Sequence, residues 1–165
     1  MNKGVLLFFA SVFTTLLFGQ TNFKRNSIYL EGGGNGLFAS VNYERQLTKE
    51  PGLGVRLGVG MYSEKDFFLT IPVGINYLFP LKKTGSFIDA GLGVTITKVD
   101  AKFFDHSTRA KEYNFVNFIP SIGYRRHIEK DVMWRISVTP IVNKHGAWPW
   151  LGFSVGKGFS AAIIE

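Results

Sequence analysis

The 165-residue sequence predicts an all-β protein, an eight-stranded antiparallel up-and-down barrel that spans a membrane and follows an N-terminal signal peptide. Three observations lead to this fold class. Hydrophobic residues alternate with small or polar ones in eight segments, which is the period of a β-strand. Turn sequences containing glycine, proline and lysine separate these segments. The face opposite the hydrophobic one is rich in glycine, serine and threonine, which suits the narrow interior of a small barrel.

The alternation is clearest in Phe68–Phe79, where every second residue from Leu69 to Phe79 is apolar. In Leu37–Leu47 we expect Leu37 on the apolar face and Phe38 on the opposite face, after a hairpin turn at Gly33–Gly36. The eight expected strands are Ser27–Gly32, Leu37–Leu47, Gly54–Tyr62, Phe68–Phe79, Phe87–Lys98, Val116–Arg126, Trp134–Pro140 and Trp150–Phe159.

Residues 1–19 are expected to form a signal peptide, and residues 20–165 the barrel domain, with its strands within residues 27–159. Lys3 supplies a short positive segment, and Val5–Phe18 is an apolar stretch too short to cross a membrane comfortably. Gly19 and Gln20 mark a plausible cleavage zone. The absence of cysteine excludes a disulfide framework, a thiolate zinc site, a thiol nucleophile and a lipoprotein anchor.

The formal net charge is +7 and the isoelectric point is about 9.7, which would be compatible with a nucleic-acid partner. The basic residues do not form a stripe, however. They occur singly or in pairs at expected turns, as at Lys82–Lys83, or alone inside strands, as at Arg56. A basic exported protein that meets an anionic lipid surface is the better interpretation, and no nucleic-acid partner is expected.

The polar face carries few charges, and these are of both signs. A water-facing strand surface would carry many lysines and glutamates, so we expect this face to line the barrel interior and the apolar face to meet lipid. Three acids can then neutralise three arginines in an ion-pair network, with Arg56 on the next strand as the expected partner of Glu44. The expected interior charges are Glu31, Glu44, Arg56, Asp89, Arg125 and Arg135.

Aromatic residues of the apolar face gather at the ends of the even-numbered segments and at the start of the seventh. Such sorting is typical of an aromatic girdle at one membrane interface, because amphipathic rings prefer the headgroup level. The expected girdle consists of Tyr43, Tyr77, Phe79, Tyr124, Trp134 and Phe159.

The signal segment, the eight alternating strands and the last strand ending at Phe159 resemble small outer-membrane β-barrels of Gram-negative bacteria, the OmpA/OmpX-type and porin-like families. The resemblance implies a bacterial outer-membrane location, contact with outer-membrane lipid, and insertion by the barrel assembly machinery. It also implies a periplasmic N-terminus, which puts the aromatic girdle on the periplasmic side, and extracellular loops at residues 100–114 and 142–149, which could contact an external partner. The chain departs from these families by continuing as Ser160–Glu165 after the terminal aromatic residue.

No catalytic residue, metal or cofactor is expected. His106, Ser107 and Glu112 resemble the site of outer-membrane lipid A deacylases, but their spacing and loop context differ from that family. Asp100, Asp105, His106 and His145 could form a loop metal site, although nothing fixes their spacing. We therefore expect a structural or interaction protein, and a lipid-modifying barrel enzyme or a lipocalin-like soluble binder remains the alternative.

Overall fold

The computed structural model describes residues 23–63, 67–98, 115–143 and 146–160. These residues form ten strands and two single-turn 3-10 helices. No helix in the described ranges is long and apolar enough to cross a membrane. The elements are β1 (Asn26–Gly33), η1 (Gly34–Gly36), β2 (Ala39–Gln46), β3 (Leu53–Ser63), β4 (Phe67–Pro80), β5 (Ser86–Lys98), β6 (Phe115–His127), η2 (Glu129–Asp131), β7 (Val132–Val138), β8 (Ile141–Asn143), β9 (Gly146–Trp148) and β10 (Leu151–Phe159).

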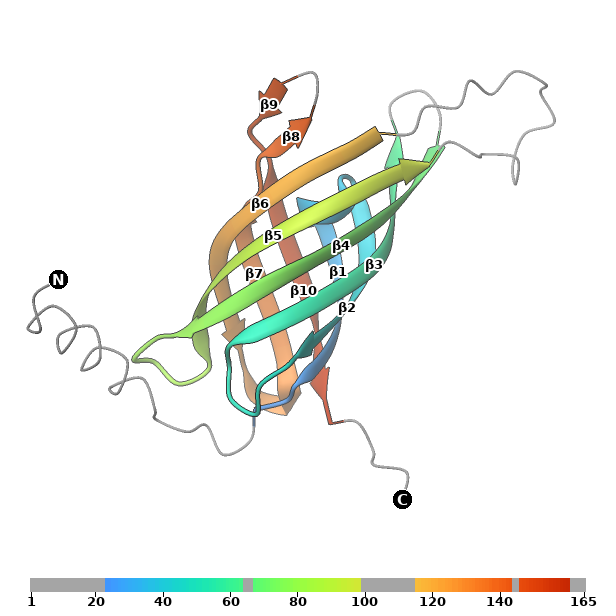
Figure 1. The fold of residues 1–165 in the computed structure, drawn as a ribbon. Coiled ribbons are helices and arrows are strands. Elements are labelled where there is room, and N and C mark those ends of the chain that lie inside the picture. The colour runs from blue at the N-terminus through green and yellow to red at the C-terminus, as the bar shows by residue number, and fades with distance from the viewer. Residues whose placement is uncertain (1–22, 64–66, 99–114, 144–145, 161–165) are drawn as a thin grey trace, which may run out of the picture.

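The strands close into one antiparallel barrel (Figure 1). Each strand from β1 to β6 pairs with the next along the chain, β7 pairs with β10, and β10 pairs with β1 to complete the ring. Closure leaves no free sheet edge in the wall of the barrel. The predicted eight-stranded up-and-down barrel is confirmed.

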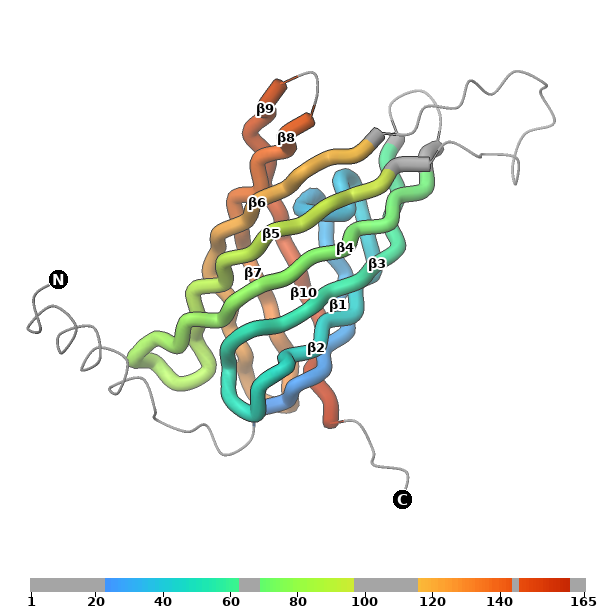
Figure 2. Tube along the Cα trace, viewed as in Figure 1, coloured from blue at the N-terminus to red at the C-terminus, as the bar shows by residue number. Residues whose placement is uncertain are grey.

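The ten strands follow eight lines around the barrel, because two of these lines are each interrupted at a proline. β8 pairs with β6 at Val142 and Phe118, in the same register in which β7 pairs with β6. The β8–β9 pairing likewise continues the β7–β10 register. Pro140 and Pro149 lie at the two interruptions, where a residue without an N–H cannot donate to the ladder. The hairpin β8–β9 therefore extends the β7–β10 hairpin beyond the rim of the barrel (Figure 2).

The two ends of the barrel differ. The turn end carries the connections 47–52, 81–85 and 128–131, and there β1 begins and β10 ends (Figure 1). The loop end carries η1 and the hairpin β8–β9, and there β3 and β5 end and β4 and β6 begin. The expected signal peptide, residues 1–19, and the segment after Ser160 lie outside the described residues.

The barrel wall has an apolar outer face and a polar inner face. Along β2, β3 and β10, exposed apolar side chains alternate with buried small or polar ones. Because a strand places successive side chains on opposite faces, the alternation in the sequence decides the polarity of each face. Large apolar residues lie on the outside of every barrel strand, among them Leu30, Val41, Leu57, Val73, Leu92, Ile122, Ile136 and Phe153.

The prediction for Leu37 and Phe38 is wrong. Leu37 is only 5% exposed and Phe38 is 60% exposed, the reverse of the expected faces. Leu37 has a φ of 73°, outside the extended region, and β2 begins only at Ala39. The alternation of β2 therefore cannot be extended backward through Leu37.

Candidate functional site

An ion-pair network fills the middle of the barrel. Arg125 on β6 binds Glu44 through both guanidinium Nη atoms, with Nη1–Oε1 and Nη2–Oε2 distances of 2.5 and 2.6 Å. Its Nη2 also lies 2.8 Å from Oδ2 of Asp89. All three side chains are fully buried. Bidentate, charge-assisted contacts of this kind are the strongest that an arginine makes with a carboxylate.

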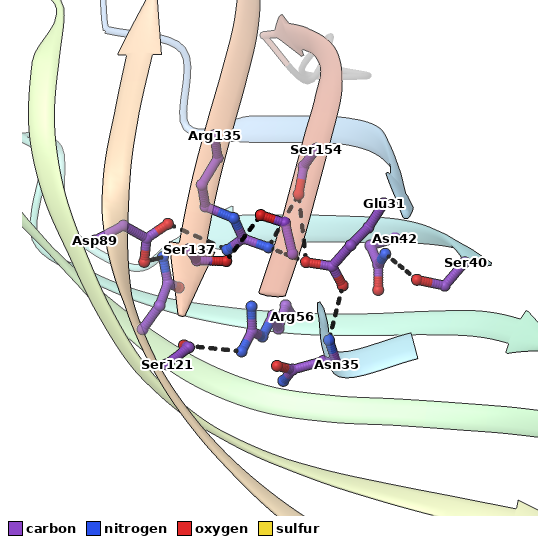
Figure 3. A network of polar contacts seen from close by, with 12 residues as sticks. Glu31, Asn35, Ser40, Asn42, Arg56, Asp89, Ser121, Arg135, Ser137 and Ser154 are labelled. Carbon is purple, nitrogen blue, oxygen red and sulfur yellow. Dashed lines mark hydrogen bonds and ion pairs between the residues drawn. The ribbon is translucent and has the colours of Figure 1, made fainter. Parts of the chain in front are cut away.

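Arg135 on β7 extends the network toward β1. Its guanidinium pairs with Glu31 and, at 3.2 Å, with Oδ2 of Asp89, and it donates to Ser154 Oγ at 3.2 Å. Figure 3 shows Arg135 reaching between Asp89 and Glu31. Its Cζ also lies 5.3 Å from the ring centroid of Tyr29, within cation–π range. Asp89 thus bridges the two arginines.

Arg56 does not join the network as expected. It stands opposite Glu44 in the β2–β3 register, yet Glu44 pairs with Arg125 instead. Within the described residues no carboxylate lies within 4.0 Å of Arg56. The Arg56 side chain is 3% exposed, and its Nη2 donates to Ser121 Oγ at 3.5 Å (Figure 3). Arg56 therefore balances the three acids through space and not through a direct ion pair.

The connection between β1 and β2 folds into the barrel at the loop end. Gly34, Asn35 and Gly36 form η1 and are all buried. The Asn35 N–H donates to Glu31 Oε2 at 3.1 Å, and Thr95 and Thr70 donate to the carbonyls of Asn35 and Gly36. Trp150 Nε1 donates to the Leu37 carbonyl at 3.0 Å. The segment Gly34–Leu37, which we call the inner turn, therefore closes the interior above the network.

Inward glycines make room for the inner turn. A Cβ at Gly93 would collide with the Asn35 side chain, and a Cβ at Gly152 would lie 2.9 Å from the Gly34 Cα. The backbone of the turn also depends on glycine, because Gly33 and Gly34 have φ values of 70° and 62°.

Replacing Gly152 by alanine is expected to destabilise the barrel by about 1 to 3 kcal/mol, since the added methyl group would lie 2.9 Å from the Gly34 Cα, a backbone atom of the inner turn that cannot swing aside as a side chain can. Gly32→Ala is the matched control, because a Cβ at Gly32 would meet no atom within 4 Å. Urea unfolding of the folded barrel measures both changes. Equal effects of the two substitutions would show that the inner turn does not occupy the interior.

Apolar side chains fill the interior at the turn end. Leu78, Phe87 and Met133 point inward and are fully buried. Phe23, immediately before β1, packs its ring against Phe87 at a centroid distance of 6.0 Å and against His127 at 5.7 Å. The interior is thus occupied along its length by an apolar layer, the ion-pair network and the inner turn.

The six residues of the predicted girdle lie on the outer face at the turn end, in three pairs of neighbouring rings. The centroid distances are 6.3 Å for Tyr43 and Phe159, 4.6 Å for Tyr77 and Phe79, and 5.5 Å for Tyr124 and Trp134. Two of the hydroxyl groups are engaged: Tyr43 donates to Asn26 Oδ1 at 2.8 Å, and Tyr124 donates to Ser86 Oγ at 2.9 Å.

The residues weighed as catalytic or metal-binding candidates lie outside the described residues. Residues 100–114, which include His106, Ser107 and Glu112, are not described, and neither is His145. Among the residues that are described, no group of three or more histidine, aspartate or glutamate side chains could hold a metal ion.

The sequence did not reveal the inner turn or the role of Phe23. The only signal for the turn is the sequence Gly-Gly-Gly-Asn-Gly at positions 32–36, which is equally typical of an ordinary hairpin. Thr70 and Thr95 lie on the polar face of their strands in the sequence pattern, but nothing in their spacing points to the carbonyl groups of a distant connection.

Comparisons with known proteins bear on the fold. No protein-family model matches the chain, and no curated protein sequence matches it. Among solved structures, the N-terminal β-barrel domain of Pseudomonas aeruginosa OprF is similar, with a TM-score of 0.54 and 12% sequence identity over 81% of this chain and 95% of that one. At this identity the likeness concerns the fold alone. Together with the closed ring of strands, it confirms the predicted fold, an eight-stranded antiparallel β-barrel.

Proposed function

We propose that the chain is a bacterial outer-membrane β-barrel protein of structural or interaction type, exported through its signal peptide. One observation carries the proposal: apolar side chains cover the outer face of the barrel, while charged and polar side chains fill the inside. A bilayer favours that polarity. A lipocalin-like soluble binder would need the reverse, with an apolar cavity inside and a polar surface in water.

The filled interior supports a structural role over conduction. Arg125, Arg135 and their carboxylate partners occupy the middle, and the inner turn and the apolar layer lie on either side of them. Buried ion pairs satisfy charges that would otherwise be costly in the interior of so narrow a barrel.

Contact with an external partner would fall to the loop end. The extracellular loops 100–114 and 142–149 are the proposed contact surface, because the inner turn is withdrawn into the barrel. Trp148 in the hairpin β8–β9 is 61% exposed, and an exposed tryptophan beyond the rim suits a contact residue.

Two measurements test this function together. The protein should fractionate with the outer membrane and change its gel mobility on heating, as folded barrels do when they unfold. Reconstituted into a planar bilayer, it should give no stable conductance. A monomer that remained soluble without detergent would refute the membrane assignment, and a steady open channel would refute the closed interior.

A further inference from the structure

Basic residues dominate the turn end of the barrel. Among the described residues there, the acidic ones are only Glu50, Glu129 and Asp131. The basic residues at this end are Lys24, Arg25, Arg45, Lys49, Lys82, Lys83, Arg126, Lys130 and Lys157. A surplus of this kind attracts anionic groups.

Arg45 and Lys157 differ from the other cations of this end. Each lies inside a strand, on the outer face, and is exposed. Neither makes an ion pair or a hydrogen bond within the described part of the chain. By contrast, Arg25 donates to the carbonyls of Gln46 and Leu47, and Arg126 donates to Ser86 Oγ. Arg45 and Lys157 are therefore free for an external ligand.

Arg45 and Lys157 flank the beginning of β1. Arg45 on β2 stands opposite Asn26, and Lys157 on β10 stands opposite Ile28. Two strand spacings and a shift of two residues put their Cα atoms about 12 Å apart. Both side chains are long enough to bend toward a single ligand group on the outer face of β1. Tyr43 and Phe159 adjoin them on the same face.

The surface next to these cations is apolar. From Ile28 toward the loop end, the outer face presents the exposed side chains of Leu30, Val41 and Val155. A ligand held by Arg45 and Lys157 therefore needs a negative head at the aromatic rings and an apolar tail along β1.

We propose that Arg45 and Lys157 form a binding site for the phosphate of an anionic phospholipid whose acyl chains lie along β1. This inference rests on the proposed membrane location. It goes further in naming a lipid class and a position on the barrel. A soluble acidic macromolecule is the less suitable ligand, because it would reach the turn lysines Lys82 and Lys83 before cations set among lipid-facing residues.

The test uses the chain refolded into nanodiscs containing equal amounts of phosphatidylglycerol and phosphatidylcholine. Native mass spectrometry at about 0.3 M salt, where diffuse charge effects are screened, measures which lipid stays bound. The wild-type chain should retain phosphatidylglycerol preferentially. Arg45→Gln with Lys157→Gln should lower that preference by about fivefold for each cation removed.

The matched control is Lys82→Gln with Lys83→Gln, which removes the same charge from the turn 81–85. The preference of this control variant for phosphatidylglycerol should differ from that of the wild-type chain by less than twofold. Loss of preference in the control to the same degree as in the site pair, or no preference in the wild-type chain, would overturn the site while leaving the barrel assignment intact. Binding to a soluble polyanion without a lipid preference would also overturn it. A chain that fails to insert, seen as an absence of heat-modifiable mobility, would refute the proposed function itself and the site with it.

Discussion

Leu92→Arg is expected to destabilise the folded protein in a bilayer by about 2 to 4 kcal/mol, as for arginine at the lipid-facing midplane of other barrels. Leu92 lies near the middle of β5, pairs with Ile75 and Pro120, and is 47% exposed on the outer face. Lipid at that depth cannot solvate a guanidinium, and neither membrane interface is near. Urea unfolding in liposomes, followed by tryptophan fluorescence, measures the change in the free energy of unfolding.

Leu53→Arg supplies the control with the same chemical change. Leu53 begins β3 at the turn end, opposite Tyr77, and is 41% exposed on the outer face. There the guanidinium can reach the headgroups, so the expected cost is about 0 to 1 kcal/mol. In a water-soluble barrel both arginines would be solvated and both substitutions mild. Equal costs at the two positions would therefore refute a lipid-facing outer surface.

The alternation of the sequence predicted the barrel wall well for a physical reason. In a strand with one apolar and one polar face, the parity of a residue, its odd or even position along the strand, decides which face its side chain occupies. Phe68–Phe79 could therefore be assigned without knowledge of the neighbouring strands. Parity says nothing where the backbone leaves the extended region. The faces of Leu37 and Phe38 were wrong because the φ of Leu37 is positive and η1 intervenes before β2.

The interior charges were identified by the same parity, but their partners were not. Glu44 and Arg125 are 81 residues apart in the sequence and meet across the barrel. The sequence suggested Arg56 because it lies on the neighbouring strand, where pairs are usually sought. In a narrow closed barrel, long inward side chains can reach the opposite wall, and a bidentate contact there replaces the nearer partner. Periodicity in one strand carries no information about such contacts.

Arg125→Met is expected to destabilise the barrel by about 3 to 5 kcal/mol, because breaking a buried pair leaves a carboxylate without its cation. Glu44 loses both of its contacts with the guanidinium, and Asp89 keeps its ion pair with Arg135 and its hydrogen bond from the Asn76 amide. Methionine retains an unbranched apolar side chain at this position, so the loss reports mainly on charge. Urea unfolding of the folded protein in liposomes measures it.

Arg56→Met is the matched control, since it removes an equally inward arginine whose one described partner is Ser121 Oγ at 3.5 Å. Its expected cost is well below that of Arg125→Met, because Arg56 makes one weak hydrogen bond and acts on the three acids only through space, with no bidentate contact to break. Adding Glu44→Gln to Arg125→Met should recover part of the larger loss, because the uncompensated carboxylate is then removed, and contacting residues of this kind couple by roughly 0.5 to 3 kcal/mol. The opposite result would be an equal loss of stability in the two arginine variants and no recovery in the double variant. The interior would then be hydrated well enough to hold an unpaired carboxylate, and the ion pairs would not be what stabilises it.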